Sequence, residues 1–410
     1  MSTTAGSPTA RASSRAILES LGLEPVINAL GPASQLGCAT LSEEVRAAMD
    51  AAAQHYVPIS EMQERASRAI VTATGAEAGC VASGGDACLC LAAAACIAGE
   101  DPAAMDRLPD ANGLRNEIVV HRGQRNPFDH ALRAAGARFV EFGYVGQGSG
   151  VGAYRWQLEA AINDKTAAIF YVGGHAQANM LPFDDFIEVA RARRVPVIVD
   201  GAGEDIRGIR DLIARGADLI ATSGGKDLRG PAASGVLAGR RDLIRAATLQ
   251  QQDMHVHPDL WAPPLADGCP SVLMHEPPHQ GIGRSFKVGR EELAGLIVAL
   301  EALADRDPDA ERRLWHSICA RLADTVEGVG GATASVATTA PPSYPRTIVQ
   351  LPSADRAHKV VAALAAGKPR VWVNGMAMRN GQIGIAPTEL RDEDVPELER
   401  RLIEVLNGGV

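Results

Sequence analysis

Short apolar runs alternate with amphipathic segments through the middle of this 410-residue chain. The runs are brief, rich in β-branched residues and mostly without polar alternation, which is typical of strands buried on both faces. Segments with helical periodicity lie between many of them, for example residues 182–194 and 205–217. Strand, helix, strand at this spacing predicts βαβ units, and therefore an α/β fold with a parallel sheet. The expected strands are residues 117–120, 138–143, 167–172, 195–200, 217–222 and 235–239.

The pattern changes towards the C-terminus. Residues 288–307 have the periodicity of a long amphipathic helix, and separate strand-like pieces with helical flanks follow it. This change predicts a second, smaller α+β domain. The expected division is a disordered arm over 1–20, an N-terminal segment over 21–55, a large domain over 56–290 and a small domain over 291–410. The expected strands of the small domain are residues 347–351, 370–375 and 382–386.

Charge and composition narrow the classes of partner and compartment. A formal net charge of −9 disfavours nucleic acid and anionic membranes as main partners. No apolar run approaches the roughly 18 residues of a membrane span, and the first fifteen residues lack the apolar stretch of a secretory signal. The seven cysteines include no CxxC pair, which indicates buried thiols in a reducing cytoplasm and no zinc site.

Three glycine-rich or acidic pieces carry the chemistry. In the first, Ser83, Gly84 and Gly85 precede an Ala/Leu/Cys-rich helical run, so they either cap a helix or hold a phosphate at its N-terminus. In the second, Asp200 ends a buried strand, where it either caps a helix or meets a ligand beyond the sheet. In the third, the next strand leads through Ser223 and two glycines to Lys226.

The order of these pieces indicates one cofactor. Asp200 and Lys226 are separated by about one helix and one strand, so neighbouring strands are expected to bring both to the same edge of the sheet. A desolvated lysine can form a Schiff base with an aldehyde, and a carboxylate can pair with a cationic ring nitrogen. An aldehyde, a ring nitrogen and a phosphate together describe pyridoxal 5′-phosphate.

The chain resembles the fold-type I pyridoxal-phosphate enzymes, and within them the group of bacterial selenocysteine synthase (seryl-tRNA selenium transferase) and the D-glucosaminate-6-phosphate ammonia-lyase type. The pieces "DLIATSGGKDLRGPAASGVLAGRRDLI" and "GIGRSFKVGREELAGLIVALE" carry this most specifically. The similarity runs from about residue 25 to about residue 305. It implies the aspartate aminotransferase-like fold, with a mostly parallel seven-stranded sheet, and a homodimer or higher homo-oligomer with active sites at the subunit interface.

The resemblance also implies roles by position. Lys226 forms the internal aldimine and then moves the α-proton, and Asp200 keeps the pyridinium nitrogen protonated. Ser83, Gly84 and Gly85 hold the phosphate with the help of Ser223. Ala202 lies against one face of the ring, and Gln124 or His121 covers the other face.

The chain departs from the family pattern around the ring. Relatives often read Asp-Ala-Ala-Ala-Glu where this chain has Asp200-Gly-Ala-Gly-Glu204, and they often have His at the position of Gln124. These differences leave the substrate open.

Other candidates surround this site. His175 follows a strand and either bonds to the backbone or contacts substrate, and Arg379 either is a solvated charge or binds the substrate carboxylate. Arg284 and Lys287 are expected to reach a neighbouring subunit's site. The histidines of the Pro-rich segment 253–283 suggest either a lid over the active site or a metal site, and the lid is preferred. They are His255, His257, His275 and His279.

The sequence therefore predicts an enzyme acting on an amino acid or amino-sugar acid through an external aldimine and an α-carbanion. A lyase that eliminates ammonia is preferred, and racemase or epimerase and aminotransferase remain alternatives. A non-catalytic regulatory protein with the same fold is the alternative of another class.

Overall fold

The computed structural model describes residues 14–145, 152–174, 180–265, 277–338 and 344–408. The chain divides into two compact units. The larger consists mainly of Pro32–Asp307, and the smaller combines Met1–Gly31 with Pro308–Thr339 and Tyr344–Val410. No helix among the described residues is both long and apolar enough to cross a bilayer.

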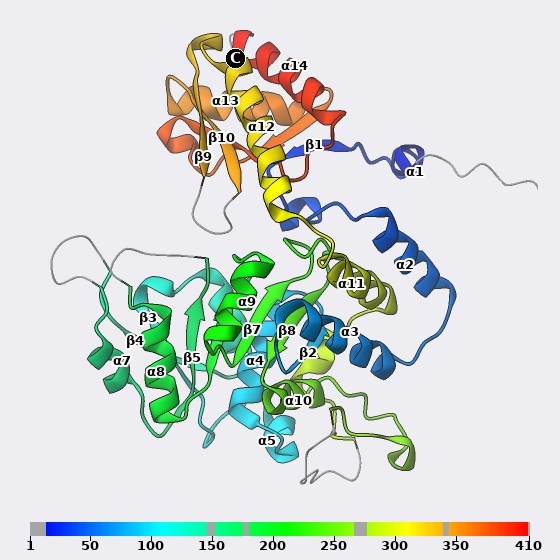
Figure 1. Cartoon of the computed structure of the whole chain (residues 1–410), viewed down its shortest axis with the longest axis vertical. Coiled ribbons are helices and arrows are strands. Elements are labelled where there is room, and N and C mark those ends of the chain that lie inside the picture. Colours follow the sequence, from blue (N-terminus) through cyan, green and yellow to red (C-terminus); the bar gives the residue numbers. More distant parts are fainter. Residues whose placement is uncertain (1–13, 146–151, 175–179, 266–276, 339–343, 409–410) are drawn as a thin grey trace, which may run out of the picture. The chain divides into compact units, whose positions relative to one another are not determined.

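A seven-stranded sheet forms the centre of the larger unit, in the order β2-β8-β7-β6-β5-β3-β4 (Figure 1). Neighbouring strands pair in parallel along the series β7-β6-β5-β3-β4, which confirms the predicted α/β fold. Their bounds are β2 (Ala78–Ala82), β3 (Glu117–His121), β4 (Arg138–Phe142), β5 (Thr166–Val172), β6 (Val197–Asp200), β7 (Leu219–Ser223) and β8 (Gly235–Gly239).

One expected direction was wrong, because β8 runs antiparallel to both β7 and β2. The connection from β7 to β8 spans residues 224–234 and contains no helix, so the chain turns directly back beside β7. The strand β2 was not among those expected from the sequence. It lies at the edge of the sheet, immediately before the Ser83–Gly85 segment.

Helices cover both faces of the sheet. Leu, Ala and Cys side chains of α4 pack with Ile118, Val120 and Phe170 on one face, whereas α8 and α9 pack with Val119 and Ile169 on the other. The α4 run is apolar all round, which suits a helix buried in the core. The helices are α2 (Glu43–Gln54), α3 (Ile59–Thr74), α4 (Gly85–Ala98), α5 (Pro102–Arg107), α6 (His130–Ala134), α7 (Arg155–Ala161), α8 (Phe183–Arg193), α9 (Ile206–Arg215), α10 (Arg241–Leu249) and α11 (Arg290–Ala302).

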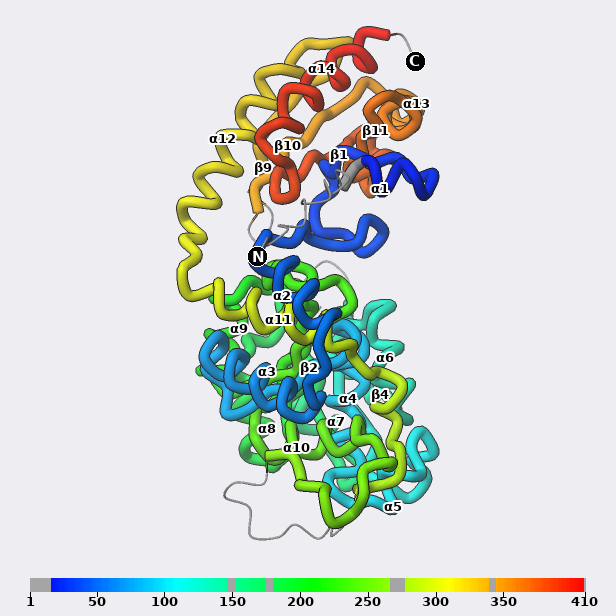
Figure 2. The backbone as a smooth tube through the Cα atoms, turned by 90° about the vertical axis from the view of Figure 1, so that its right-hand side faces the viewer, coloured from blue at the N-terminus to red at the C-terminus, as the bar shows by residue number. Residues whose placement is uncertain are grey.

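The division between the units differs from the one expected. The helix α11 packs against α2 and α3 (Figure 2), so the larger unit continues to Asp307 instead of ending near residue 290. The same contacts assign α2 to the larger unit, although the sequence placed residues 21–55 in a segment of their own.

The smaller unit has an α+β arrangement, as predicted. A three-stranded antiparallel sheet has the order β12-β10-β9, and β1 pairs in parallel with β11. Residues 14–20 form α1 instead of continuing a disordered arm, and β9 was not expected. The elements are α1 (Ser14–Ser20), β1 (Val26–Ala29), α12 (Pro308–Val326), β9 (Thr333–Thr338), β10 (Pro345–Gln350), α13 (Ala354–Ala366), β11 (Arg370–Val373), β12 (Gln382–Ile385) and α14 (Asp394–Asn407).

Candidate active site

Asp200 and Lys226 meet at the carboxyl edge of the sheet. Asp200 is the last residue of β6, and it lies beside Ala221 of the neighbouring parallel strand β7. The Asp200 carboxylate accepts a 3.0 Å hydrogen bond from the Ala202 N–H, and the Lys226 ammonium donates to the Ala202 carbonyl over 3.3 Å. The structure therefore gathers both polar groups around the main chain of Ala202, while only 7% of Asp200 is exposed.

The turn that carries Lys226 is tied down by backbone hydrogen bonds. The Gly224 N–H donates to the Ser234 carbonyl, and the Gly225 carbonyl accepts from the Ala39 N–H, each over 2.8 Å. The Lys226 carbonyl itself accepts from the Arg229 N–H over 3.0 Å. These bonds restrain the backbone on the N-terminal side of residue 226 and close the turn after it, and they leave its half-buried side chain to reach Ala202.

The N-terminus of α4 forms a cradle at the same edge. Gly84 precedes the helix with a φ of 112°, a backbone conformation that residues other than glycine rarely adopt. A Cβ at Gly235 would lie 2.3 Å from the Gly84 carbonyl oxygen, and one at Gly85 would lie 3.6 Å from the Ser223 nitrogen. The close approach shows that the start of α4 lies against the ends of β7 and β8.

Two amides at this N-terminus are already engaged. The Ser83 N–H donates to the Phe286 carbonyl over 3.2 Å, and the Gly84 N–H donates to the Ala82 carbonyl over 2.8 Å. A helix leaves its first N–H groups without intrahelical partners, so the donors that face a bound anion come from Gly85 and the rest of the first turn. Ser83 has an exposed side chain and can contribute only its hydroxyl.

Gln124 is deeply buried near Asp200. Only 3% of it is exposed, its amide nitrogen donates to the Val172 carbonyl over 3.0 Å, and Val172 lies beside Asp200 in the sheet. The amide oxygen of Gln124 is buried and has no hydrogen-bond partner among the described residues. A buried acceptor without a partner is costly, so this oxygen indicates a place for a ligand donor.

His121 faces a different neighbourhood. Its Nδ1 accepts a 3.1 Å hydrogen bond from the Gly123 N–H, and its ring packs edge-on against Phe142 at 5.4 Å. Burial lowers the pKa of His121 below its usual value, and the positive charge of Arg122 lowers the pKa further. Of the two residues weighed as a cover for the ring, Gln124 bonds to Val172 beside Asp200, whereas His121 ends β3 and its Nε2 is buried without a partner among the described residues.

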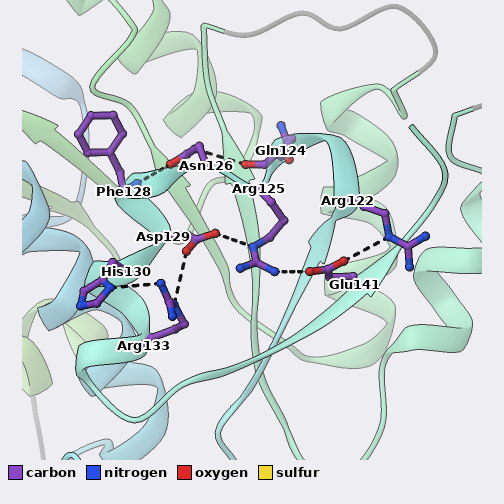
Figure 3. A network of polar contacts seen from close by, with 9 residues as sticks. All are labelled: Arg122, Gln124, Arg125, Asn126, Phe128, Asp129, His130, Arg133 and Glu141. Carbon is purple, nitrogen blue, oxygen red and sulfur yellow. Dashed lines mark hydrogen bonds and ion pairs between the residues drawn. The ribbon is translucent and has the colours of Figure 1, made fainter. Parts of the chain in front are cut away.

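Ion pairs hold the segment that carries Gln124. Figure 3 shows the chain of contacts, in which Arg125 bridges Asp129 and Glu141 while Arg122 also pairs with Glu141. The Arg122–Glu141 distance is 3.2 Å, and Arg133 approaches Asp129 at 3.5 Å. Sequence reasoning missed this network, although Arg125, Asp129 and Arg133 recur at a spacing of four residues.

A cavity of about 430 Å³ lies close to the cradle and is lined by Arg284, Ser285 and Lys287. Arg284 donates to Asp253 over 2.9 Å. The neighbouring Phe286 accepts the hydrogen bond from Ser83, which connects this cavity to the start of α4. The cavity thus offers the Lys287 ammonium and the guanidinium of Arg284, whose charge Asp253 partly balances.

Among the residues that it describes, the structure gives no contact between the other predicted residues and this group. His175 and His275 lie outside the described residues, and Arg379 is exposed in the smaller unit. Over the described ranges there is no group of three His, Cys, Asp or Glu side chains able to hold a metal. The other histidines of the Pro-rich segment each lie near one aspartate: His255 near Asp253, His257 near Asp259 and His279 near Asp106.

Comparisons with known proteins agree on one family. The model of the aminotransferase class-V family matches residues 118–255. D-glucosaminate-6-phosphate ammonia lyase from Salmonella typhimurium is 37% identical over 291 residues, 70% of this chain and 69% of that protein. The 5′-C-glycyluridine monooxygenase-decarboxylase from a Streptomyces species is 32% identical over 412 residues, 95% of this chain and 92% of that protein.

A solved structure from the same group of enzymes is similar over nearly the whole chain. The solved structure of a D-glucosaminate-6-phosphate ammonia-lyase superimposes with a TM-score of 0.76 at 31% identity, covering 96% of this chain and 98% of the other. Seryl-tRNA selenium transferases are also among the relatives. These similarities confirm the resemblance drawn from the glycine-rich and lysine-bearing pieces.

Proposed function

Because the chain belongs to the fold-type I pyridoxal-phosphate enzymes, in the family that includes D-glucosaminate-6-phosphate ammonia lyase, we propose that it is a lyase that releases ammonia from an amino acid or amino-sugar acid. The substrate carries an α-amino group and a β-hydroxyl. The α-proton and the β-hydroxyl leave as water, and hydrolysis of the resulting enamine returns the water, so the products are a 2-oxo acid and ammonia.

The cofactor of this family is pyridoxal 5′-phosphate. When bound, it supplies an aldehyde that condenses with amines and a ring that withdraws electrons from the α-carbon. The residues of the cradle fit it, because the first turn of α4 offers amides to a phosphate and Ser223 lies beside them. The amide nitrogen of Gln124 bonds to Val172 beside Asp200, and its buried oxygen has no partner in the part of the chain that the structure describes.

Lys226 is the residue that exchanges protons and bonds the aldehyde in this proposal. Its ammonium lies at the sheet edge within reach of the Ala202 carbonyl, and it returns the α-proton or removes it according to the step. Asp200 donates no proton; its buried negative charge keeps a cationic ring nitrogen protonated. With the cofactor bound, Ala202 would lie against one face of the ring and Gln124 would cover the other.

An anionic end of the substrate is proposed to bind in the cavity lined by Arg284 and Lys287. Lys287, the Ser285 hydroxyl and the guanidinium N–H groups of Arg284 that Asp253 does not occupy suit a phosphate or carboxylate. The backbone contact with Ser83 keeps this cavity near the cradle. The proposal retains Arg379 as a partner for the substrate carboxylate and His175 as a substrate contact.

The observation that carries the proposal is the shared contact of Asp200 and Lys226 with Ala202. The test incubates the purified chain with D- and L-amino acids and with amino-sugar acids, including D-glucosaminate 6-phosphate, in heavy water. Release of ammonia with a stoichiometric 2-oxo acid, deuterated at the β-carbon, is the expected result.

Other outcomes assign other activities. Deuterium at the α-carbon without net product indicates a racemase or epimerase, and an oxo acid formed only with an acceptor indicates an aminotransferase. Consumption of dioxygen with release of carbon dioxide indicates a decarboxylating oxidation like that named for the Streptomyces relative. A protein that gains no visible absorption with added pyridoxal phosphate would be the non-catalytic alternative.

We also propose a homodimer that works in the cytoplasm. Tyr56 and Val57, between α2 and α3, are 93% and 43% exposed, and Ile59, the first residue of α3, is 47% exposed. Contiguous exposed apolar side chains mark interaction surfaces. Free thiols at all six described cysteines suit a reducing compartment. Light scattering of the purified chain tests the dimer, and a monomer that retains activity would contradict it.

A further inference from the structure

The residue after Lys226 joins three parts of the larger unit. The Asp227 carboxylate accepts a 3.0 Å hydrogen bond from the Ile206 N–H through one oxygen and a 2.9 Å bond from Arg306 through the other. Arg306 also donates to the Asp227 main-chain carbonyl over 2.7 Å. The side chains of Asp227 and Arg306 are only 6% and 13% exposed, so this pair is largely withdrawn from water.

One of these contacts reaches back to the Asp200 segment. Ile206 is the first residue of α9, and the short loop before it contains Ala202 and directly follows Asp200, the last residue of β6. Asp227 therefore ties the turn that carries Lys226 to the segment that carries its hydrogen-bond partner. The Lys226 side chain has four rotatable methylenes and is only half-buried, so its own contact with Ala202 does not hold the turn in place.

Arginine is suited to the other contact. Its planar fork donates to the side chain and to the main chain of Asp227 at once, which fixes the backbone direction at residue 227 as well as the carboxylate. Lysine at position 306 would keep the charge but present a single nitrogen.

We propose that Asp227 and Arg306 are positioning residues, which hold Lys226 against Ala202 in the geometry that bonds the cofactor aldehyde. Neither side chain touches the aldehyde, and both act through the backbone of the Lys226 turn. This inference rests on the proposed function of Lys226 as the residue that bonds pyridoxal phosphate.

The test follows reconstitution and needs no substrate. The full chain is depleted of pyridoxal phosphate, the cofactor is added back at increasing concentrations, and growth of the visible absorption band is recorded. The cofactor concentration that gives half of the maximal rate depends on binding in the phosphate cradle. The limiting first-order rate at saturating cofactor depends on how fast Lys226 bonds the aldehyde. Asp227→Asn and Arg306→Gln should each lower the limiting rate about 10- to 100-fold, the effect of a misplaced reacting group, and leave the half-saturating concentration unchanged.

The double variant and a conservative variant sharpen the result. If Arg306 acts through Asp227, combining Asp227→Asn with Arg306→Gln slows the reaction no more than the slower single variant. Arg306→Lys should have a limiting rate between those of Arg306→Gln and the wild type. Wild-type limiting rates in both single variants, or effects that multiply in the double variant, overturn the inference. If Asp227→Asn does not fold, an unchanged rate in Arg306→Lys overturns it as well.

A matched ion pair provides the structural control. Glu100, just beyond the far end of α4, pairs with Arg245, whose side chain is 9% exposed. Glu100→Gln should lower the thermal midpoint without changing the limiting rate, and an equal slowing by this variant would overturn the inference. Borohydride reduction of the wild type separates the two proposals, because label on another residue defeats the proposed function itself.

Discussion

The ammonium of Lys226 lies 3.3 Å from the carbonyl oxygen of Ala202 and is anchored there by a neutral acceptor. The N–H of Ala202 donates a 3.0 Å hydrogen bond to the Asp200 carboxylate. One peptide segment thus orients both a cation and an anion at the end of neighbouring strands. This arrangement lets the carboxylate face a ring nitrogen while the lysine remains available to an aldehyde.

Replacing Asp200 tests the carboxylate. Asp200→Asn keeps the acceptor for the Ala202 N–H but removes the charge that stabilises a protonated ring nitrogen, so kcat should fall about 10²- to 10³-fold. Turnover is measured with the substrate found in the heavy-water screen. Asp211→Asn, on the exposed side of α9, is the control and should leave kcat unchanged. A wild-type kcat in Asp200→Asn would show that the charge of Asp200 is not needed to keep the ring nitrogen protonated.

Removing Asp129 tests the network around the Gln124 segment. The Asp129 carboxylate is 4% exposed and serves two arginines, so Asp129→Asn should lower the free energy of unfolding by about 1–3 kcal/mol. Denaturant unfolding near neutral pH measures the change. Glu159→Gln removes an exposed partner of Arg155 and should change stability little. Equal losses in both variants would show that the network is no stronger than a surface pair.

The buried imidazole of His121 makes stability depend on pH. Its pKa is lowered in the folded chain, chiefly by burial, whereas in the unfolded chain it protonates near its ordinary value of about 6.5. Below that pH the unfolded state takes up a proton that the folded state does not. The free energy of unfolding therefore decreases as the pH falls below about 6.5. The total decrease is about 1.4 kcal/mol for each unit by which folding lowers the pKa of His121.

A variant isolates this contribution. His121→Asn keeps an acceptor for the Gly123 N–H and removes the titrating group. Thermal midpoints compared between about pH 7 and about pH 5 should fall less in the variant than in the wild type. Parallel pH profiles for the two proteins would mean that His121 is protonated equally in both states.

The main features of the site could be predicted because they follow the chain locally. Each parallel strand ends at the same edge of the sheet, so the positions of Asp200 and Lys226 after consecutive strands were enough to bring them together. The glycines before α4 left two interpretations open, a helix cap or a phosphate site, because both follow from a helix N-terminus. The sequence alone did not reveal that the Ser83 N–H is taken by Phe286, some two hundred residues later.

Long-range contacts account for what was missed. The partner of Arg122 and Arg125 is Glu141, which comes beside them only because β3 and β4 pair in register. Arg306 reaches Asp227 across 79 residues, and no local pattern marks that pair. The direction of β8 depends on a helix-free connection, which an apolar run cannot specify by itself.

Reductive labelling tests the central claim most directly. The purified chain is saturated with pyridoxal phosphate and reduced with borohydride, and the modified peptide is sequenced, with Lys226→Arg as a matched control that keeps the charge. We predict one cofactor label, on Lys226, and none in Lys226→Arg, which should still bind the cofactor through the α4 cradle. Label on a different lysine, or an equal label in Lys226→Arg, would contradict the account.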